Sequence, residues 1–544
     1  MTETRQPTVQ TVAEHIAARL VEEGVEVVFT VPGEQMDALF GALAKTGIRI
    51  VHTRHEQAAA FMAYGYARST GRIGVHVCIS GPGVLHSAAG LALGYSGDAR
   101  MLCLAGQIAT PAIGRGYGVP HEIPDQLGIL RGLTGWAERV AAPGRIGPVL
   151  AEAFHRLRHD RPRPVAVEIP AEVLTATVGQ PDPWTAPPHR RPLDRAALDQ
   201  ARSLLAQAKA PLIFVGSGAR AAAADVTRLA ELLGAPVTSE MGGRGVVPDD
   251  HELSIQLPVA HKLWPRVDVV LAIGTRLMRP QVQWGLDDAL QVIRIDLDPE
   301  EINRVATPAV GLVADAAEAV HALLEGLPKR DGGEDWRRAV DEARREIDVE
   351  LAKLVPQVDF LAAIRAALPP EGFFVDELTQ IGYAARIAYP VLRPYTYVIS
   401  TYQGGLGFGF ATALGVQVAN PGKPVLSVSG DGGFLYTGNE LATAVLHGIP
   451  VVAVVFNDNS FANIARSQRE LLGTTVATKL HNPDFVQYAA AFGAHGVRVD
   501  TPKELEREIT AAFTRADLPT VIEVPVGEMP SPWPLIRLPK VRNR

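Results

Sequence analysis

The sequence contains very little cysteine. Of its 544 residues only Cys78 and Cys103 are cysteines, and each lies within an apolar run. Two cysteines cannot build a disulfide scaffold or a cysteine-based zinc site, so a reducing, cytoplasmic setting is expected. The N-terminal segment lacks the apolar core of a signal peptide, and no run reaches the roughly 18 apolar residues that a membrane-spanning helix needs. The sequence therefore predicts a soluble protein with no membrane partner.

A strong excess of one charge is also absent. The chain has 52 Lys and Arg residues against 59 Asp and Glu residues, a net charge of −7. This balance gives no global field that would attract nucleic acid, so no nucleic-acid partner is expected. Hydrophobic residues make up 47% and charged residues 20%, which is typical of globular proteins. At roughly 150 residues per domain, the length predicts three or four compact domains.

Short apolar runs rich in β-branched residues recur along the whole chain. Nearly every position in them is apolar, which is typical of strands buried on both faces of a parallel sheet. Helical patterns such as residues 13–24 and 224–234 lie between the runs, and each ends at a glycine. The alternation predicts an α/β protein with doubly wound parallel sheets. The predicted strands are residues 25–29, 74–80, 101–106, 165–170, 211–216, 267–274, 292–298, 425–430 and 451–456.

Two segments interrupt this alternation. Residues 178–194 are rich in proline and are predicted to form a linker. Residues 326–353 are dense in charge and are predicted to be a linker that enters an exposed helix. These breaks divide the chain into three predicted domains, which comprise residues 1–175, 195–325 and 355–535.

The segment 425–464 carries the most informative polar residues. It has the pattern of a strand, a turn, a helix and a second strand, with GDGG (430–433) after the first strand and NDN (457–459) after the second. Because the carboxyl ends of parallel strands meet at one edge of a sheet, Asp431 and Asp458 are expected to lie close together. Two carboxylates with a backbone carbonyl suit Mg²⁺, and glycines let backbone N–H groups approach a phosphate.

These motifs resemble those of the thiamine diphosphate-dependent enzymes of the acetolactate synthase, pyruvate oxidase and 2-oxo acid decarboxylase superfamily. The resemblance implies thiamine diphosphate and Mg²⁺ as cofactors, with Asp431, Asp458 and the carbonyl of Ser460 as metal ligands. This chain departs from the family pattern in one respect, because Asp458 stands where the family has an Asn. The diphosphate-binding residues that the resemblance implies are Gly430, Gly432, Gly433 and Asn457.

The resemblance extends to the other two domains. Residues 48–83 are similar to the family's pyrimidine-binding domain, in which a Glu at a helix start hydrogen-bonds the aminopyrimidine ring, and that residue is Glu56 here. A carboxylate at this place promotes the imino tautomer, whose nitrogen removes the thiazolium proton. Residues 400–415 are similar to the segment that supports the bent cofactor, with Leu406 beneath it and the Gly404 carbonyl accepting from the 4′-amino group.

The resemblance also bears on the central domain and on assembly. The central domain binds FAD in some members of the family and ADP or nothing in others. GSGAR (216–220) lacks the full dinucleotide fingerprint, so it indicates a nucleotide only weakly. In the family the Glu-bearing domain of one subunit faces the diphosphate-binding domain of the next, which implies a homodimer at least and often a homotetramer.

The fate of the decarboxylated substrate depends on pocket residues, for which the resemblance implies Glu34, Gln35, Gln107 and His121. The segment around Gln107, LAGQIATPAIG, is similar to acetolactate synthases and predicts a carboligase that uses pyruvate or a related 2-oxo acid as donor. Ile464 stands where simple decarboxylases have a Glu, which also favours carboligation.

Other functions stay open. Glu34 and His121 stand near the proton-relay residues of simple decarboxylases, so a non-oxidative 2-oxo acid decarboxylase or a hydroxyketone lyase is the alternative. A non-catalytic cofactor-binding subunit is a remote alternative, which the presence of both Glu56 and Asp431 disfavours. A dehydrogenase is disfavoured because the full dinucleotide fingerprint is missing.

Overall fold

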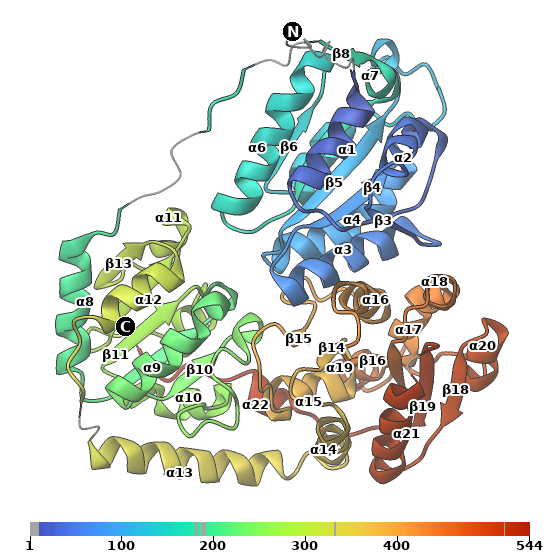
Figure 1. Cartoon of the computed structure of the whole chain (residues 1–544). Coiled ribbons are helices and arrows are strands. Elements are labelled where there is room, and N and C mark those ends of the chain that lie inside the picture. The colour runs from blue at the N-terminus through green and yellow to red at the C-terminus, as the bar shows by residue number, and fades with distance from the viewer. Residues whose placement is uncertain (1–9, 180–182, 187–191, 331–332, 516, 544) are drawn as a thin grey trace. The chain divides into compact units, whose positions relative to one another are not determined.

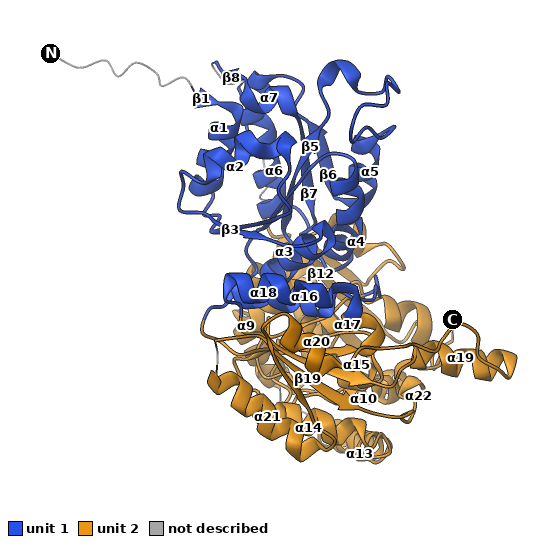
Figure 2. Cartoon of the chain, turned by 90° about the vertical axis from the view of Figure 1, so that its right-hand side faces the viewer, with its two compact units in different colours: residues 1–189, 402–421, 435–449 blue, residues 190–401, 422–434, 450–544 orange. Residues whose placement is uncertain are grey.

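A computed structural model of the chain describes all residues except 1–9, 180–182, 187–191, 331–332, 516 and 544. The chain forms two compact units, each built from segments that are far apart in the sequence (Figure 2). Unit 1 comprises residues 1–189, 402–421 and 435–449, and unit 2 comprises the rest. Among the described residues, no helix combines the length and the apolarity that crossing a membrane requires.

Unit 1 contains a six-stranded parallel sheet whose strand order is β3-β2-β4-β5-β7-β6. Every residue of its four inner strands is buried, as the predicted runs at 74–80, 101–106 and 165–170 require for three of them. The strands are β2 (Val27–Thr30), β3 (Arg49–His52), β4 (Gly74–Cys78), β5 (Met101–Gln107), β6 (Trp136–Arg139) and β7 (Val165–Pro170), and β1 (Gln10–Thr11) pairs antiparallel with β8 (Thr177–Val178).

Helices cover both faces of this sheet (Figure 1). α1 begins with a capping box in which the Thr11 side chain accepts from the Glu14 N–H, and the chain leaves the helix through Gly24 at φ 74°. Apolar side chains of α1, α2 and α6 pack on one face, and α3 contacts α4 and the sheet on the other. The helices are α1 (Val12–Glu22), α2 (Asp37–Leu43), α3 (Glu56–Thr70), α4 (Pro82–Ser96), α5 (Gln126–Leu133), α6 (Ile146–His159) and α7 (Ala171–Thr175).

Two helices from later in the chain also belong to unit 1, namely α16 (Gly409–Ala419) and α18 (Leu441–His447). α16 packs against α3 with their backbones in close contact. A Cβ atom on Gly65 would lie 2.2 Å from the Thr412 carbonyl oxygen, and one on Gly415 would lie 2.0 Å from the Met62 carbonyl oxygen. Glycine is therefore required on both helices, and this packing supports the helix that begins with Glu56.

Unit 2 contains two parallel sheets. The first has the strand order β10-β9-β11-β12-β13 and lies in the predicted central domain. Its two faces are buried in different clusters, one with α8, α9 and α12 and the other with α10 and α13. The elements are α8 (Arg195–Gln207), β9 (Pro211–Val215), α9 (Ala223–Leu233), β10 (Val237–Ser239), α10 (Leu257–Leu263), β11 (Val269–Ile273), β12 (Gln291–Asp296), α11 (Pro299–Ile302), β13 (Val310–Val313), α12 (Ala316–Leu324) and α13 (Glu334–Leu351).

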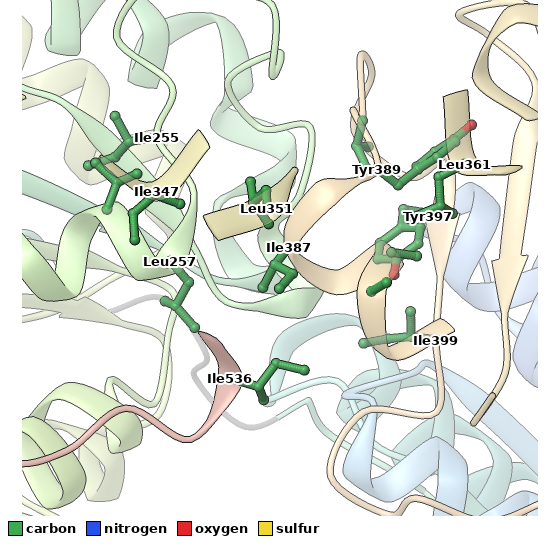
Figure 3. Close-up of a cluster of buried hydrophobic side chains, with 14 of the residues drawn as sticks. Ile255, Leu257, Ile347, Leu351, Leu361, Ile387, Tyr389, Tyr397, Ile399 and Ile536 are labelled. Atoms are coloured by element: carbon green, nitrogen blue, oxygen red, sulfur yellow. The ribbon is translucent and has the colours of Figure 1, made fainter. Parts of the chain in front are cut away.

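The second sheet of unit 2 has the order β15-β14-β16-β17-β19-β18 and is also parallel. Its apolar side chains contact α14, α15 and α21, and the same cluster extends to α13 and the start of α10, as Figure 3 shows for Leu257, Leu351 and Tyr397. The elements are α14 (Gln357–Ala367), β14 (Phe373–Asp376), α15 (Gln380–Ala388), β15 (Tyr397–Val398), β16 (Val425–Gly430), α17 (Asp431–Thr437), β17 (Val452–Asn457), α19 (Ala462–Leu472), α20 (Phe485–Ala491), β18 (His495–Arg498), α21 (Pro502–Arg515), β19 (Thr520–Pro525) and α22 (Trp533–Ile536).

Three parallel α/β sheets confirm the predicted fold class. The segment predicted as a linker at 178–194 lies partly outside the described residues; Val178 ends β8, and residues 179, 183–186 and 192–194 have no regular structure. The charged segment 326–353 does enter a helix, α13, but this helix is only half exposed, because an apolar stripe that includes Trp336 and Ile347 is buried. The many charged residues of α13 lie on the opposite face of the helix.

The close contact between α3 and α16 gives a stability prediction. Gly415→Ala places a methyl group against the Met62 carbonyl, and overpacking of this kind costs about 1–3 kcal/mol. The thermal unfolding midpoint is expected to fall. The control is Gly41→Ala in α2, where a Cβ atom meets nothing within 4 Å and alanine is the better helix former by up to about 1 kcal/mol. Equal midpoints for the two variants would contradict the packing argument.

Candidate active site

The two acidic residues predicted to hold a metal lie at the ends of neighbouring strands. β16 and β17 pair in parallel, with Gly430 opposite Phe456, so Asp431 and Asp458 both follow the carboxyl edge of the sheet. The Asp431 side chain is buried, and Asp458 is half-buried. Burial together with the negative charge of Asp431 raises the pKa of Asp458 to about 6. The structure thus brings the two carboxylates together, as the sequence predicts.

The oxygen atoms of Asp458 have different surroundings. Oδ2 accepts a hydrogen bond from Gln380 Nε2 at 2.9 Å, whereas Oδ1 is buried and has no hydrogen-bond partner among the described residues. An unpartnered buried carboxylate oxygen is costly unless a cation balances it. With Asp431 beside it, the donor set therefore fits a hard divalent cation such as Mg²⁺.

Asn482, which was not among the residues predicted from the sequence, lies next to Asp431. Its Nδ2 donates to Asp431 Oδ2 at 2.6 Å and also lies within 3.1 Å of the Oδ1 atoms of Asn457 and Asn459. Burial raises the pKa of Asp431, and the hydrogen bond from Asn482 acts against this shift. The signal that could have found Asn482 is weak, since it lies in an irregular segment far from the glycine motif.

The residues predicted to contact the diphosphate lie around the start of α17. A Cβ atom on Gly432 would lie 2.6 Å from the Phe461 ring, and one on Gly433 would lie 2.5 Å from Glu377 Oε1, so neither position accepts a side chain. Gly430 has more space, since its nearest neighbour would be 3.5 Å away. Asn457 binds protein groups instead, because its Nδ2 donates to Glu523 Oε1 at 2.8 Å.

The segment predicted to support the cofactor rings belongs to unit 1. Gly404 has φ 60° and is exposed, and Leu406 is half-buried. Gly407 has φ 81°, and a Cβ atom there would lie 2.2 Å from the Tyr436 side chain. The backbone that carries Leu406 is therefore fixed by glycine geometry, while the roles of Gly404 and Leu406 toward a cofactor stay predictions.

Glu56 is the first residue of α3 and is buried, with 8% of its surface exposed. The preceding residue, His55, caps the helix by accepting from the Gln57 N–H at 3.1 Å. The helix start stabilises the negative charge of Glu56. A buried acid at this position has the charge and the location that proton exchange with a bound base requires.

His86 on α4 is the partner of Glu56, and the sequence analysis missed it. Its Nδ1 lies 2.9 Å from Glu56 Oε2, and its side chain is 48% exposed. The His86 ring also lies 4.7 Å from that of His55, measured between centroids. An available signal was its place one turn into the helix that follows the SGPG turn at 80–83. An imidazole that contacts both a buried carboxylate and solvent can carry protons between them.

Gln107 lies in a buried network and is only 3% exposed. Its Nε2 donates to Glu168 Oε1 at 2.9 Å, and its Oε1 accepts from the Ile108 N–H at 2.7 Å. Glu168 also accepts from Gln126 and pairs with Arg139. Both ends of the Gln107 amide are therefore committed to protein groups, although the sequence analysis placed it in the substrate pocket.

The other predicted pocket residues lie in two segments of unit 1, a short 3-10 helix (Glu34–Met36) and the loop that carries His121. Gln35 Oε1 accepts from the Ser80 hydroxyl at 2.6 Å, which ties the first segment to the SGPG turn. Glu34 is exposed. His121 is exposed and has φ 68°, and its carbonyl would lie 2.4 Å from a Cβ atom on Gly81. His121 thus contacts the SGPG turn through its backbone.

Close packing explains why the GSGAR segment of the central domain contains two glycines. A Cβ atom on Gly216 would lie 2.3 Å from the Gly274 carbonyl oxygen, and one on Gly218 would lie 2.8 Å from the Gly274 Cα atom. These glycines allow the ends of β9 and β11 to pack closely. The pattern therefore does not by itself indicate a nucleotide, and FAD binding stays a prediction.

The family models that match this chain include residues of all three sheets. Models of the thiamine pyrophosphate enzyme family match residues 10–129 (N-terminal TPP binding domain), 198–323 (central domain) and 379–524 (C-terminal TPP binding domain). The chain is similar to a probable 2-ketoarginine decarboxylase of Pseudomonas aeruginosa, with 33% identity over 94% of each chain. It is also similar to the acetolactate synthase large subunit of Haemophilus influenzae, with 30% identity over 96% of each chain.

The raised pKa of Asp458 predicts a pH-dependent metal affinity. A carboxylate must lose its proton before it binds a cation, so Mg²⁺ affinity is expected to fall as the pH decreases through about 6. Titrations with Mn²⁺ between pH 5 and 8, followed by electron paramagnetic resonance, measure this dependence. Asp458→Asn removes the proton at this position and should make the dependence shallower. An identical pH dependence in both proteins would contradict the prediction.

Proposed function

The chain belongs to the thiamine pyrophosphate enzyme family, and on this premise we propose that it is an enzyme that decarboxylates a 2-oxo acid. Thiamine diphosphate is the cofactor that its domains imply, and when bound it supplies the electron sink for decarboxylation. The observation that carries the proposal is the presence of two separate chemical groups in one chain. One is the buried carboxylate of Glu56 with its imidazole partner, and the other is the carboxylate pair Asp431 and Asp458.

The residues of unit 2 are proposed to hold the cofactor's charged end. Asp431, the free Oδ1 of Asp458 and the carbonyl of Ser460 would bind Mg²⁺, which balances both the carboxylates and the diphosphate. Gly432 and Gly433, which have no room for a side chain, are proposed to contact phosphate oxygens through their backbone N–H groups. The proposed role of these groups is binding and orientation.

The residues of unit 1 are proposed to move protons. Glu56 would donate to and accept from a ring nitrogen of the aminopyrimidine, and its burial keeps water from competing for that hydrogen bond. His86 would exchange a proton with Glu56 through Nδ1 and with solvent or substrate through its exposed edge. This pair thus connects a buried acid with the outside.

We propose release of an aldehyde as the fate of the decarboxylated substrate. Protonation at carbon needs a proton donor near the reacting atoms, and His86 beside Glu56 supports that role. Gln107, one of the two residues on which the prediction of carboligation depended, has both ends of its amide engaged with protein groups, whereas Ile464 still favours carboligation. Carboligation remains the second candidate, favoured by the 30% identity with acetolactate synthase subunits. A homodimer or homotetramer stays a proposal, which a solution molar mass of two or four times 58.2 kDa would support.

The product spectrum tests the proposed reaction. Purified protein is incubated with thiamine diphosphate, Mg²⁺ and either pyruvate or 2-ketoarginine, and the products are followed by NMR. Aldehyde and CO₂ are expected from one of these 2-oxo acids. Glu56→Gln keeps the shape of the side chain but removes the exchangeable charge, and the rate is expected to fall at least about 100-fold. If acetolactate or a hydroxyketone forms in place of aldehyde, the second candidate is correct.

The role of His86 is tested by the partition between products. His86→Ala removes the proposed proton donor, so aldehyde release is expected to fall about 100-fold. With an acceptor aldehyde supplied, the hydroxyketone share of the product should increase, because the unprotonated species lives longer. His321→Ala, which removes an exposed histidine on α12, is the control and should leave the partition unchanged. A uniform loss of both products would instead indicate that His86 only orients Glu56.

A further inference from the structure

Gln380 is the first residue of α15 and is buried, with 8% of its surface exposed. It follows the helix cap Thr379, whose side chain accepts from the Gly382 N–H at 2.8 Å. The backbone of Gln380 is therefore set by the capped helix start. Its side chain extends toward the loop that carries Asp458 and toward the segment that follows β19.

The two ends of the Gln380 amide are distinguished by their partners. Oε1 accepts from the Met529 backbone N–H at 2.8 Å and from Arg466 Nη2 at 3.3 Å. Both partners are donors, so the oxygen must face them. Nε2 consequently faces Asp458 Oδ2 at 2.9 Å, and it also lies 3.2 Å from the Gly527 carbonyl oxygen. The direction of the hydrogen bond to Asp458 is thus fixed by groups outside the metal site.

This direction determines which oxygen of Asp458 is available. The Gln380 amide occupies Oδ2, while Oδ1 stays without a hydrogen-bond partner among the described residues. An Asn at position 458 could not accept in the same way if its oxygen served the cation, because its NH₂ group would then face the NH₂ group of Gln380.

Resting on the proposed function, we propose that Gln380 is a positioning residue for the metal site and that its amide is matched to a carboxylate at position 458. It holds Oδ2 so that Oδ1 faces the cation, and Met529 and Arg466 hold Gln380 in turn. Partners that orient a metal ligand in this way typically change metal affinity 10- to 100-fold when removed. The Asp458 that departs from the family pattern and Gln380 therefore form one functional pair.

The first experiment measures the dissociation constant of Mn²⁺ in the presence of thiamine diphosphate by electron paramagnetic resonance. Gln380→Met removes the donor while keeping the side-chain length, and the dissociation constant is expected to rise at least about tenfold. The matched control is Gln357→Met. Gln357 is also buried and donates to the same C-terminal segment, at the Pro530 carbonyl, 2.6 Å away. A role in holding that segment alone would affect both variants equally, whereas the proposal expects less than about a twofold change in the control.

The second experiment exchanges the donor and the acceptor. Gln380→Glu alone makes two acceptors face each other, and Asp458→Asn alone makes two donors face each other, so each single variant should bind Mn²⁺ more weakly. The double variant restores one donor and one acceptor at unchanged total charge, and its dissociation constant should return to within about threefold of the wild-type value. Such non-additivity is the signature of a direct pairwise interaction.

The results of these experiments distinguish a failure of the proposed role of Gln380 from a failure of the proposed function. If wild-type protein with thiamine diphosphate does not bind Mn²⁺, the proposed function fails and this role fails with it. If the wild type binds but Gln380→Met does not weaken binding, or the effects of Gln380→Glu and Asp458→Asn simply add, only the role of Gln380 is overturned. Far-UV circular dichroism and thermal unfolding verify that the variants fold. Should Gln380→Met fail to fold, the donor and acceptor exchange decides the question by itself.

Discussion

The electrostatic repulsion between Asp431 and Asp458 is the constraint on which the candidate metal site of unit 2 depends. Two carboxylates that are partly removed from water repel each other, and this repulsion contributes to the raised pKa of Asp458. The repulsion arises because β16 and β17 pair in parallel and leave both acids at one edge of the sheet. A divalent cation at that edge converts the repulsion into binding energy.

Amide side chains complete this arrangement. Asn482 donates to Asp431, and Gln380 donates to Asp458. Amides are neutral, so they orient a carboxylate without balancing its charge, and the charge stays available for a metal. A lysine or arginine at either place would neutralise the site. The choice of amides is therefore chemically consistent with a site that has to bind a cation and still remain folded without it.

In unit 1 the buried acids Glu56 and Glu168 differ in the partners that surround them. Glu56 is buried at a helix start, which suits a negative charge, and the half-exposed imidazole of His86 contacts it. Gln107, Gln126 and Arg139 converge on the buried Glu168 and hold the neighbouring strand ends together. Glu168 is thus paired with three side chains and serves the structure, whereas Glu56 pairs with the side chain of His86.

Local pattern was sufficient to predict the three parallel α/β sheets, the ends of α1 and α9, and the meeting of Asp431 with Asp458. These features depend on the period of apolar residues and on strand order, which neighbouring residues reveal. The local sequence pattern did not predict the hydrogen-bond partners of these acidic residues. His86 lies 30 residues from Glu56, Gln380 lies 78 from Asp458 and Asn482 lies 51 from Asp431. Only tertiary packing brings such residues within hydrogen-bond distance, because side-chain contacts across a fold depend on helix placement and rotamer, which no local period encodes. For the same reason the sequence could not predict that Gln107 pairs with Glu168, and its role in a substrate pocket stays a prediction.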